Sequence, residues 1–385
     1  MAEPEDIISF KVQKGEALHR QITNHFRALI SSGKLPPGSK LSRMHDLAAQ
    51  WNTNYFTVHT ALTRLVREGL LERKPRLGTF VRKKIKQLTS VGIYYGDEIL
   101  IKHERAFYRA LHGQLLNLLQ KENISAKVFI DSRPRALQEE PMVELLESVH
   151  SRSIHGLIVP LVSYPKVDWL DKMPLPTSVF SSGRTDYSRI CIDFNQIMTM
   201  ACRTLSEQGC RTVGLVFPDP STDNDWGKDE TDTLSNAFET QLKAFNLKTH
   251  KSWLRRPKVH QESQEKYGYQ EFHKLWSLKD KPDGLIVYPE NVSHGVVLAA
   301  LECGVKVPSE IKLVLHKNQN VEFLCPLQAD WIITREKDIA DALIQQIKDR
   351  FAGLEPHYYE IHHEFVKGSS RDLISKFALA NKLEA

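Results

Sequence analysis

The chain has 385 residues, 41% of them hydrophobic, and a formal net charge of +5 at pH 7. It is long enough for two or three domains of roughly 100–200 residues each, and no apolar run approaches the ~20 residues of a membrane-spanning helix. Its acidic start is unlike a secretory signal, and five cysteines without CxxC spacing argue against a disulfide framework and a zinc site. We therefore expect a cytoplasmic protein that binds no metal.

The charge is distributed unevenly along the chain. Residues 1–86 carry 16 Lys and Arg against 7 Asp and Glu, a net +9, whereas the remainder carries 36 against 40, a net −4. A basic segment on a mildly acidic remainder indicates that a polyanion binds at the amino-terminal segment alone. A solvated basic surface without a partner is the alternative that charge by itself leaves open.

Three short helices are predicted in the first 70 residues. Apolar residues recur at helical spacing between positions 18 and 30, and a Pro-Pro-Gly turn at 36–38 precedes the second helix, for which Ser42 is the expected N-cap. The third helix is expected to have Asn54 as its N-cap and to stop at Gly69. Its predicted packing stripe consists of Val58, Ala61, Leu62, Leu65 and Val66.

Two short strands, at 70–73 and 79–82, are expected to follow the third helix and to be joined by a basic tip. A helix with one apolar and one polar face beside such a hairpin suits a protein that places a helix in the DNA major groove and a wing beside it. Gly78 would allow a close approach to the DNA backbone, or would be a turn glycine. His59 would contact a base, or would lie at the surface without consequence. The expected DNA-contacting residues are Lys40, Ser42, Arg43, His45, Asn54, Tyr55, Thr57, His59, Arg64, Lys74, Arg76 and Gly78.

Residues 18–81 resemble the winged helix-turn-helix domain of the GntR family of bacterial regulators. The resemblance rests on Pro37-Gly38-x-x-Leu41, Asp46-Leu47-Ala48, the apolar pattern from Thr57 to Leu70, and Gly78-Thr79-Phe80-Val81. The family usually has arginine at the positions of His45, Tyr55 and His59. Because arginine bound to guanine is the commonest specific base contact, this difference predicts an operator sequence unlike the usual one of the family.

The pattern changes after a basic and then polar linker at residues 83–90. Strands are expected at 91–95, 126–130, 156–160, 212–217, 284–288 and 312–315, and helices between them include 105–121 and 142–151. Strands that alternate with helices predict an α/β fold of parallel sheets with helices on both faces. About 300 residues of this kind exceed one comfortable core, so two lobes are expected.

Residues 88–372 resemble the LacI-type effector domain, a relative of periplasmic sugar-binding proteins. The landmarks are the strand that begins at Gly156, Asp193-x-x-Gln196, Gly209-x-Arg211-x-Val213, Asp283-Gly284 and Val307-Pro308, in this order. The resemblance implies a two-lobed fold of the type I periplasmic-binding-protein kind, with ligand in the cleft at the carboxyl ends of the strands. The combination of a GntR-like amino-terminal domain with a LacI-type effector domain is similar to that of the arabinose repressor subgroup.

The expected domains are therefore a winged helix-turn-helix at 1–82, a linker at 83–90, a two-lobed effector domain at 91–372 and a tail at 373–385. The apolar residues of the tail predict a short helix that folds back, or alternatively a partner-binding segment. By resemblance, the effector-binding residues are Tyr95, Asp97, Asp219, Trp226, Glu290, Asn291, Lys317 and Asn318. Trp226 would stack on a sugar ring, or would belong to a solvated acidic loop.

Lys317 departs from the family pattern, which often has a carboxylate nearby that grips sugar hydroxyls. Lys317 would pair with an anionic ligand, or it would pair with Glu290 and leave the cleft occupied differently. The preferred interpretation is a transcription regulator, a homodimeric repressor whose binding to duplex operator DNA is controlled by a sugar or related metabolite. The alternative is a carbohydrate-binding protein whose head only oligomerises. No catalytic motif is recognisable, so no enzymatic activity, catalytic residue or cofactor is expected.

Overall fold

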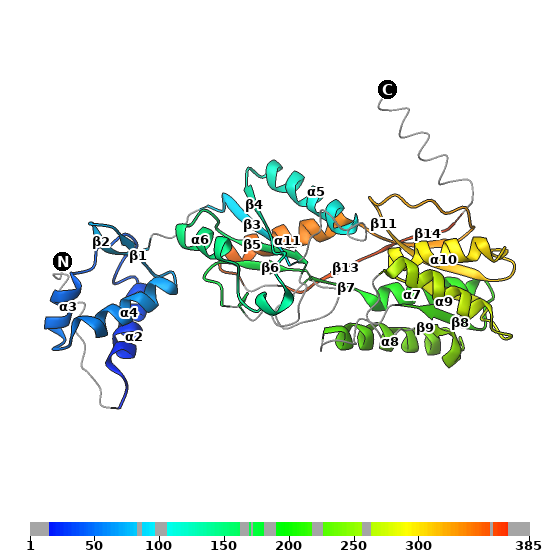
Figure 1. Ribbon diagram of the computed structural model, residues 1–385, viewed down its shortest axis with the longest axis horizontal. Helices are drawn as coiled ribbons and strands as arrows, with labels where there is room; N and C mark the ends of the chain where they lie inside the picture. Colours follow the sequence, from blue (N-terminus) through cyan, green and yellow to red (C-terminus); the bar gives the residue numbers. More distant parts are fainter. Residues whose placement is uncertain are drawn as a thin grey trace, which may run out of the picture. The chain divides into compact units, whose positions relative to one another are not determined.

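The computed structural model describes residues 15–82, 87–96, 106–161, 169–170, 172–180, 190–217, 226–255, 263–354 and 357–368, with the backbone alone for 135, 161 and 226–233. The chain divides into two compact units. The first is Met1–Leu88 with Leu146–His155 and Lys172–Leu175, and the second contains the remaining residues. Figure 1 labels most of the helices and strands of both.

Residues 15–82 form a small domain, here called the head, with one apolar core. It contains α2 (Leu18–Ser31), α3 (Met44–Gln50), α4 (Tyr55–Arg67) and an antiparallel hairpin of β1 (Leu71–Lys74) and β2 (Gly78–Val81). Every helix and both strands contribute to the core, whose members include Ile22, Phe26, Leu47, Leu62, Leu71 and Val81. The predicted helices and hairpin are thus confirmed, with strand ends shifted by one residue.

The ends of α4 follow from two residues. Asn54 Oδ1 accepts a hydrogen bond from Thr57 N at 2.8 Å, which satisfies one of the free N–H groups of the first turn. Gly69 has φ +73° and ends the helix just after its C-cap, Glu68. The prediction of Ser42 as the N-cap of α3 was wrong, because this helix begins one residue later and its N-cap, Arg43, makes no side-chain capping bond.

The second unit, here called the body, contains a four-stranded parallel sheet in the order β4-β3-β5-β6. Helix α11 comes from the far end of the chain, yet it packs against α5, β5 and β6. The elements of this first lobe are β3 (Ser90–Tyr95), α5 (Ala106–Lys121), β4 (Ser125–Ile130), β5 (Leu157–Leu161), β6 (Thr177–Val179) and α11 (Glu336–Phe351). Helix α6 (Val143–Ser151) begins in this unit and belongs to the first unit from Leu146 onward.

The second lobe is built on a six-stranded sheet in the order β14-β12-β11-β10-β8-β9, parallel except for β14. A separate parallel pair joins β7 (Ile190–Ile192) to β13 (Tyr359–Ile361). The other elements are α7 (Phe194–Glu207), β8 (Val213–Val216), α8 (Trp226–Ala244), β9 (Leu254–Arg255), α9 (Gln264–Trp276), β10 (Gly284–Val287), α10 (Glu290–Glu302), β11 (Lys312–Asn318), β12 (Asp330–Thr334) and β14 (Glu364–Val366).

Strand β11 is longer than its apolar run. The sequence predicted that the strand ends at Leu315. Lys317 and Asn318 were therefore expected after the strand, but both residues lie inside it. They pair with Ile333 and Thr334 of β12, so backbone pairing continues beyond the apolar residues. The tail predicted at 373–385 lies outside the described residues. No helix among the described residues has the length and apolar character needed to cross a membrane.

Helices α9 and α10 approach each other closely through two glycines. A Cβ atom at Gly268 would lie 2.2 Å from Val292 O, and one at Gly295 would lie 1.9 Å from Glu265 O. Both positions therefore exclude any side chain unless a helix moves.

We expect Gly295→Ala to lower the free energy of unfolding by about 1–3 kcal/mol, because overpacking displaces one helix from the other. The matched control is Gly113→Ala in α5, where an added Cβ meets nothing within 4 Å. This control should raise the free energy of unfolding by about 0.5–1 kcal/mol through helix propensity. Urea unfolding followed by circular dichroism measures both, and equal effects of the two variants would contradict the close packing.

Candidate nucleic-acid interface and ligand site

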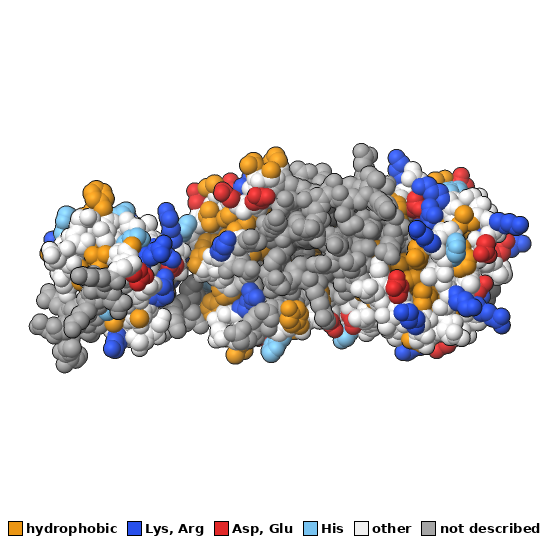
Figure 2. Space-filling view, turned by 90° about the horizontal axis from the view of Figure 1, so that it is seen from below, with side chains coloured by type: hydrophobic (Ala, Val, Ile, Leu, Met, Phe, Trp, Pro, Cys, Tyr) orange, Lys and Arg blue, Asp and Glu red, His pale blue; other side chains and the backbone are white. Residues whose placement is uncertain are grey.

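The predicted DNA-contacting residues of the head lie at its surface. Eight are exposed, and Ser42, Tyr55, Thr57 and His59 are half-buried. They lie in the segment that leads into α3, at the start of α3, on the outer side of α4 and at the β1–β2 turn. Figure 2 shows Lys, Arg and His side chains on the visible surface of the head, at the left of the view. The exposed eight are Lys40, Arg43, His45, Asn54, Arg64, Lys74, Arg76 and Gly78.

Three of these residues bring their rings together where α3 and α4 meet. The ring centroids of His45 and Tyr55 are 4.9 Å apart. Tyr55 in turn stacks on His59, one helical turn further along α4, with centroids 5.9 Å apart. The three positions that differ from the GntR pattern therefore form one contiguous cluster of rings.

Several basic residues of the head have partners within it. Arg64 and Arg27 both bind the Glu68 carboxylate, at 3.1 and 2.8 Å. Lys74 Nζ lies 3.2 Å from Glu72 and 5.2 Å from the centroid of the Phe80 ring. Because exposed ion pairs contribute little free energy, these cations can still exchange their partners for phosphate oxygens.

Arg73 joins the hairpin to α4. Its guanidinium donates to Thr63 Oγ1 at 2.8 Å and lies 3.4 Å from His59 Nε2. Arg73 was not among the predicted contact residues, since nothing in the pattern of a short strand shows which helix it faces. The structure thus places the Arg73 guanidinium beside the outer face of α4.

In the body, the predicted effector-binding residues fall in different environments. Asp97, Asp219 and the side chain of Trp226 lie outside the described residues. Tyr95, at the end of β3, is buried, and its hydroxyl lies 2.9 Å from His112 Nδ1. Asn291 is half-buried, and its Nδ2 donates to Gln264 Oε1 at 3.5 Å.

Glu290 connects the first turn of α10 to the end of β11. Its side chain is buried, the residue being only 3% exposed, and its Oε2 accepts a hydrogen bond from Asn318 N at 2.5 Å. Burial raises the pKa of Glu290 to about 7, and the nearby Glu336 carboxylate contributes to this rise. The hydrogen bond from the Asn318 N–H lowers the pKa and so opposes both effects. These contacts give Glu290 and Asn318 a structural role whether or not they also bind ligand.

Lys317 is half-buried, and its Nζ lies 5.4 Å from the centroid of the Trp331 ring. Burial lowers the pKa of Lys317, and the nearby Glu290 carboxylate opposes this effect. The two groups attract each other, but no ion pair between Lys317 and Glu290 is found among the described residues, so both sequence-based alternatives stay predictions. The Glu290 hydrogen bond nevertheless goes to the backbone of β11.

A cluster of rings that the sequence analysis did not identify lies at the carboxyl ends of β8, β10 and β11. The centroid of Tyr288 is 5.9 Å from that of Phe217, 5.6 Å from that of Phe194 and 4.5 Å from that of His316. The sequence does contain a signal for this cluster, because Phe217, Tyr288 and His316 each come directly after the apolar residues of a predicted strand. Such positions meet at one edge of a parallel sheet.

Two buried histidines adjoin this cluster. His316 Nε2 lies 2.7 Å from Thr334 Oγ1, whereas His316 Nδ1 and both ring nitrogens of His363 have no hydrogen-bond partner among the described residues. Burial lowers the pKa of His316 well below its ordinary value and the pKa of His363 to about 4. Both rings are therefore neutral at pH 7.

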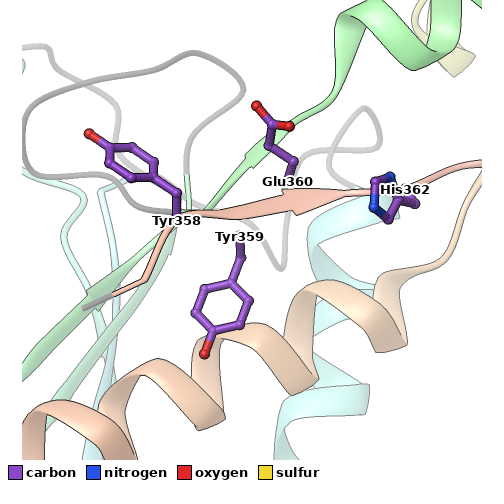
Figure 3. Close-up of a pocket in the computed structure, with 4 residues that line it drawn as sticks. All are labelled: Tyr358, Tyr359, Glu360 and His362. Carbon is purple, nitrogen blue, oxygen red and sulfur yellow. The ribbon is translucent and has the colours of Figure 1, made fainter. Parts of the chain in front are cut away.

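A cavity of about 730 Å³ lies beside β13, lined among the described residues by Tyr358, Tyr359, Glu360 and His362. In Figure 3 the Tyr359 ring points to α11, and the Glu360 carboxylate points to the opposite side of the strand. The Tyr359 hydroxyl donates to Asp349 Oδ2 at 3.2 Å. This volume suits a small metabolite. No lining residue was predicted, although two tyrosines and two histidines within six residues were a visible signal.

Comparisons with known proteins agree with this division of the chain. Residues 18–81 match the family model for bacterial regulatory proteins of the gntR family, and residues 202–329 match the periplasmic binding protein-like domain. The HTH-type transcriptional repressor PurR of Yersinia pestis bv. Antiqua is 21% identical over 235 residues, which cover 58% of this chain and 65% of that protein. PurR of Photorhabdus laumondii is 24% identical over 189 residues, which cover 47% of this chain and 52% of that protein. The chain therefore spans less than two thirds of the length of these relatives.

Solved structures show the fold of the body. The transcription regulator CcpA of Lactococcus lactis superposes with a TM-score of 0.58 at 15% identity, covering 74% of this chain and 99% of that one. The Cra transcriptional dual regulator from Pseudomonas putida, in complex with fructose 1-phosphate, gives a TM-score of 0.54 at 16% identity, covering 74% and 100%. The predicted fold class, a winged helix-turn-helix followed by a type I periplasmic-binding-protein-like domain, is confirmed.

The raised pKa of Glu290 predicts a pH-dependent effect of Glu290→Gln. The ordinary pKa of a glutamate is 4.5, and the pKa of Glu290 in the folded protein is about 7. As pH rises, the carboxyl group therefore loses its proton in the unfolded chain before it does so in the folded protein. The folded protein is destabilised as pH rises between these two values. Glutamine keeps an acceptor for Asn318 N–H without the charge. We expect the free energy of unfolding of the variant to exceed that of the natural protein by about 1–3 kcal/mol near pH 8. The difference should become progressively smaller towards pH 5. Urea titrations at both pH values measure this, and a gain independent of pH would contradict it.

Proposed function

We propose that this chain is a transcription regulator that binds a specific DNA operator through its head and responds to a small metabolite bound by its body. The observation that carries the proposal is the exposed outer face of α4 beside a basic hairpin, in a segment that matches the gntR model. The attached periplasmic-binding-like domain supplies a ligand-binding fold. Relatives of the body are named as transcriptional repressors and regulators, which supports regulation over catalysis.

On DNA, α4 enters the major groove and the β1–β2 turn lies beside it. Lys40, Arg43 and Arg76 are exposed and suited to bind phosphates, which fix the orientation of the helix. Asn54 acts through its capping bond, which positions the first turn of α4. The remaining predicted contact residues face the same partner from α3, α4 and the hairpin.

The metabolite binds in the cleft between the two lobes of the body. The Cra structure holds fructose 1-phosphate, which supports a sugar or sugar phosphate as the ligand class. The predicted residues Tyr95, Asp97, Asp219, Trp226, Glu290, Asn291, Lys317 and Asn318 remain the proposed effector set, joined by Tyr288 and His316. A ligand that prefers one arrangement of the lobes shifts the DNA-binding equilibrium by its difference in affinity for the two states.

The finer points of this proposal rest on the combination of head and body. A homodimer would match the two half-sites of a palindromic operator. The assignments as a repressor, as a cytoplasmic protein and as a member of the arabinose repressor subgroup follow from a GntR-like head on a LacI-like body. The boundaries at residues 82, 90 and 372 are proposed on the same basis.

Arg43→Ala and Arg76→Ala are expected to weaken operator binding without changing thermal stability, because both side chains are exposed. Each lost phosphate contact should reduce the slope of log affinity against log salt by about 1. The matched control is Lys279→Ala, which removes an exposed cation from the body. Fluorescence anisotropy on operator selected from genomic DNA measures the slopes. Unchanged affinity in both arginine variants, or no selected sequence at all, would favour a head that only oligomerises.

Ligand binding by the body should raise its melting temperature in a screen of sugars, sugar acids and sugar phosphates. A ligand present at 100 times its dissociation constant stabilises the native state by about 2.7 kcal/mol. The same compound should change operator affinity of the natural protein. A compound that stabilises the protein but leaves operator affinity unchanged at every concentration would refute coupling between the two sites.

A further inference from the structure

We infer that the head recognises thymine methyl groups through an aromatic patch, defined as His45, Tyr55, Phe56 and His59, and that its operator requires thymine, not guanine, beneath the start of α4. This inference rests on the proposed DNA-binding function and adds the base class that the head selects.

The four rings form one connected surface. Tyr55 is its centre, with ring centroids 4.9 Å from His45, 5.9 Å from His59 and 5.9 Å from Phe56, the last contact being edge to face. Contacts on three sides restrict the rotamers of Tyr55, so little conformational entropy is lost when the patch meets a partner.

Phe56 has no role in the core of the head. It is 77% exposed in the first turn of α4, whereas the apolar residues Val58, Ala61 and Leu62 on the same helix are fully buried. An exposed ring gains free energy only when a partner covers it. Lys40, Arg43, Arg64 and Arg76 are exposed in the same small domain, and residues 1–86 carry a net charge of +9, which favours a polyanionic partner.

The two threonine hydroxyls on this face of α4 are already used within the head. Thr57 Oγ1 donates to Asn54 Oδ1 at 3.0 Å, and Thr60 Oγ1 donates to Phe56 O at 2.8 Å. Residues 55–62, the first two turns of α4, contain no lysine or arginine. The forked donor that binds guanine O6 and N7 together is therefore missing from the part of the helix that would enter the groove first.

Thymine is the base that suits such a surface. Its C5-methyl group is the apolar feature of the major groove, and apolar side chains recognise it by contact. His59 adds one directional group: if Nε2 accepts from Arg73, which lies 3.4 Å away, the ring hydrogen is on Nδ1 and can be donated to thymine O4 or a purine N7. The patch therefore combines apolar ring surface for methyl contacts with a directional donor from His59.

The test begins with selection of duplexes from a random pool by the full-length protein. Each thymine required in the selected half-site is then replaced by deoxyuridine, which removes the methyl group and nothing else. Burial of one methyl is worth about 0.8 kcal/mol, so we expect about a fourfold loss of affinity at one or more thymines. Phe56→Ala should bind more weakly and lose this sensitivity at the thymine that Phe56 contacts.

The matched control is Leu324→Ala, which truncates a side chain of the body that is 85% exposed. This variant should keep both the affinity and the sensitivity to deoxyuridine. Equal melting temperatures of both variants and the natural protein would show that the head remains folded.

The outcomes separate this inference from the function on which it rests. A selected motif that requires guanine and tolerates deoxyuridine would overturn the inference and leave sequence-specific DNA binding intact. A motif whose sensitivity to deoxyuridine survives Phe56→Ala would also overturn it. A change in oligomeric state without a change in DNA affinity would identify the patch as a protein contact. No selected motif would overturn both proposals.

Discussion

The apolar stripe of α4 is the constraint on which the head depends. Val58, Ala61, Leu62 and Leu65 are fully buried against α2, α3 and the hairpin. Because an α-helix repeats every 3.6 residues, burial of this stripe leaves His59 and its neighbours on the outer side. The same packing that stabilises the head therefore decides which side chains a nucleic acid would meet.

In the body, a similar constraint acts on two buried carboxylates. Glu290 and Glu336 each lie in the first turn of a helix, and they bind the backbone N–H groups of Asn318 and Asn320 near the end of β11. Burial raises the pKa of both carboxyl groups, because it removes their charged forms from water. The hydrogen bonds and the helix N-termini stabilise the charged forms and so offset part of this cost. The two bonds hold the end of β11 between α10 and α11, beside the ring cluster of Tyr288 and His316.

Much of the fold could be predicted from sequence because its signals are local. The Asn54 cap and the Gly69 stop depend on side chains and dihedral angles within a few residues, and both were predicted correctly. The end of β11 could not be predicted, because it depends on pairing of Lys317 and Asn318 with residues of β12 that lie 16 positions later in the chain. The ring cluster of the body and the link from Arg73 to His59 join residues distant in sequence, and no single pattern contains them.

The sequence by itself determined the composition of each surface: a basic head with an amphipathic third helix, and a body of alternating strands and helices. Periodicity and capping are properties of short segments, so they can be recognised without knowing the fold. Only the tertiary structure decided which polar groups are buried. Glu290, His316 and His363 are charged or polar in the sequence, yet packing removes them from water and favours their neutral forms. Desolvation depends on every neighbour in space, and for that reason the chemistry of the candidate ligand site had to wait for the structure.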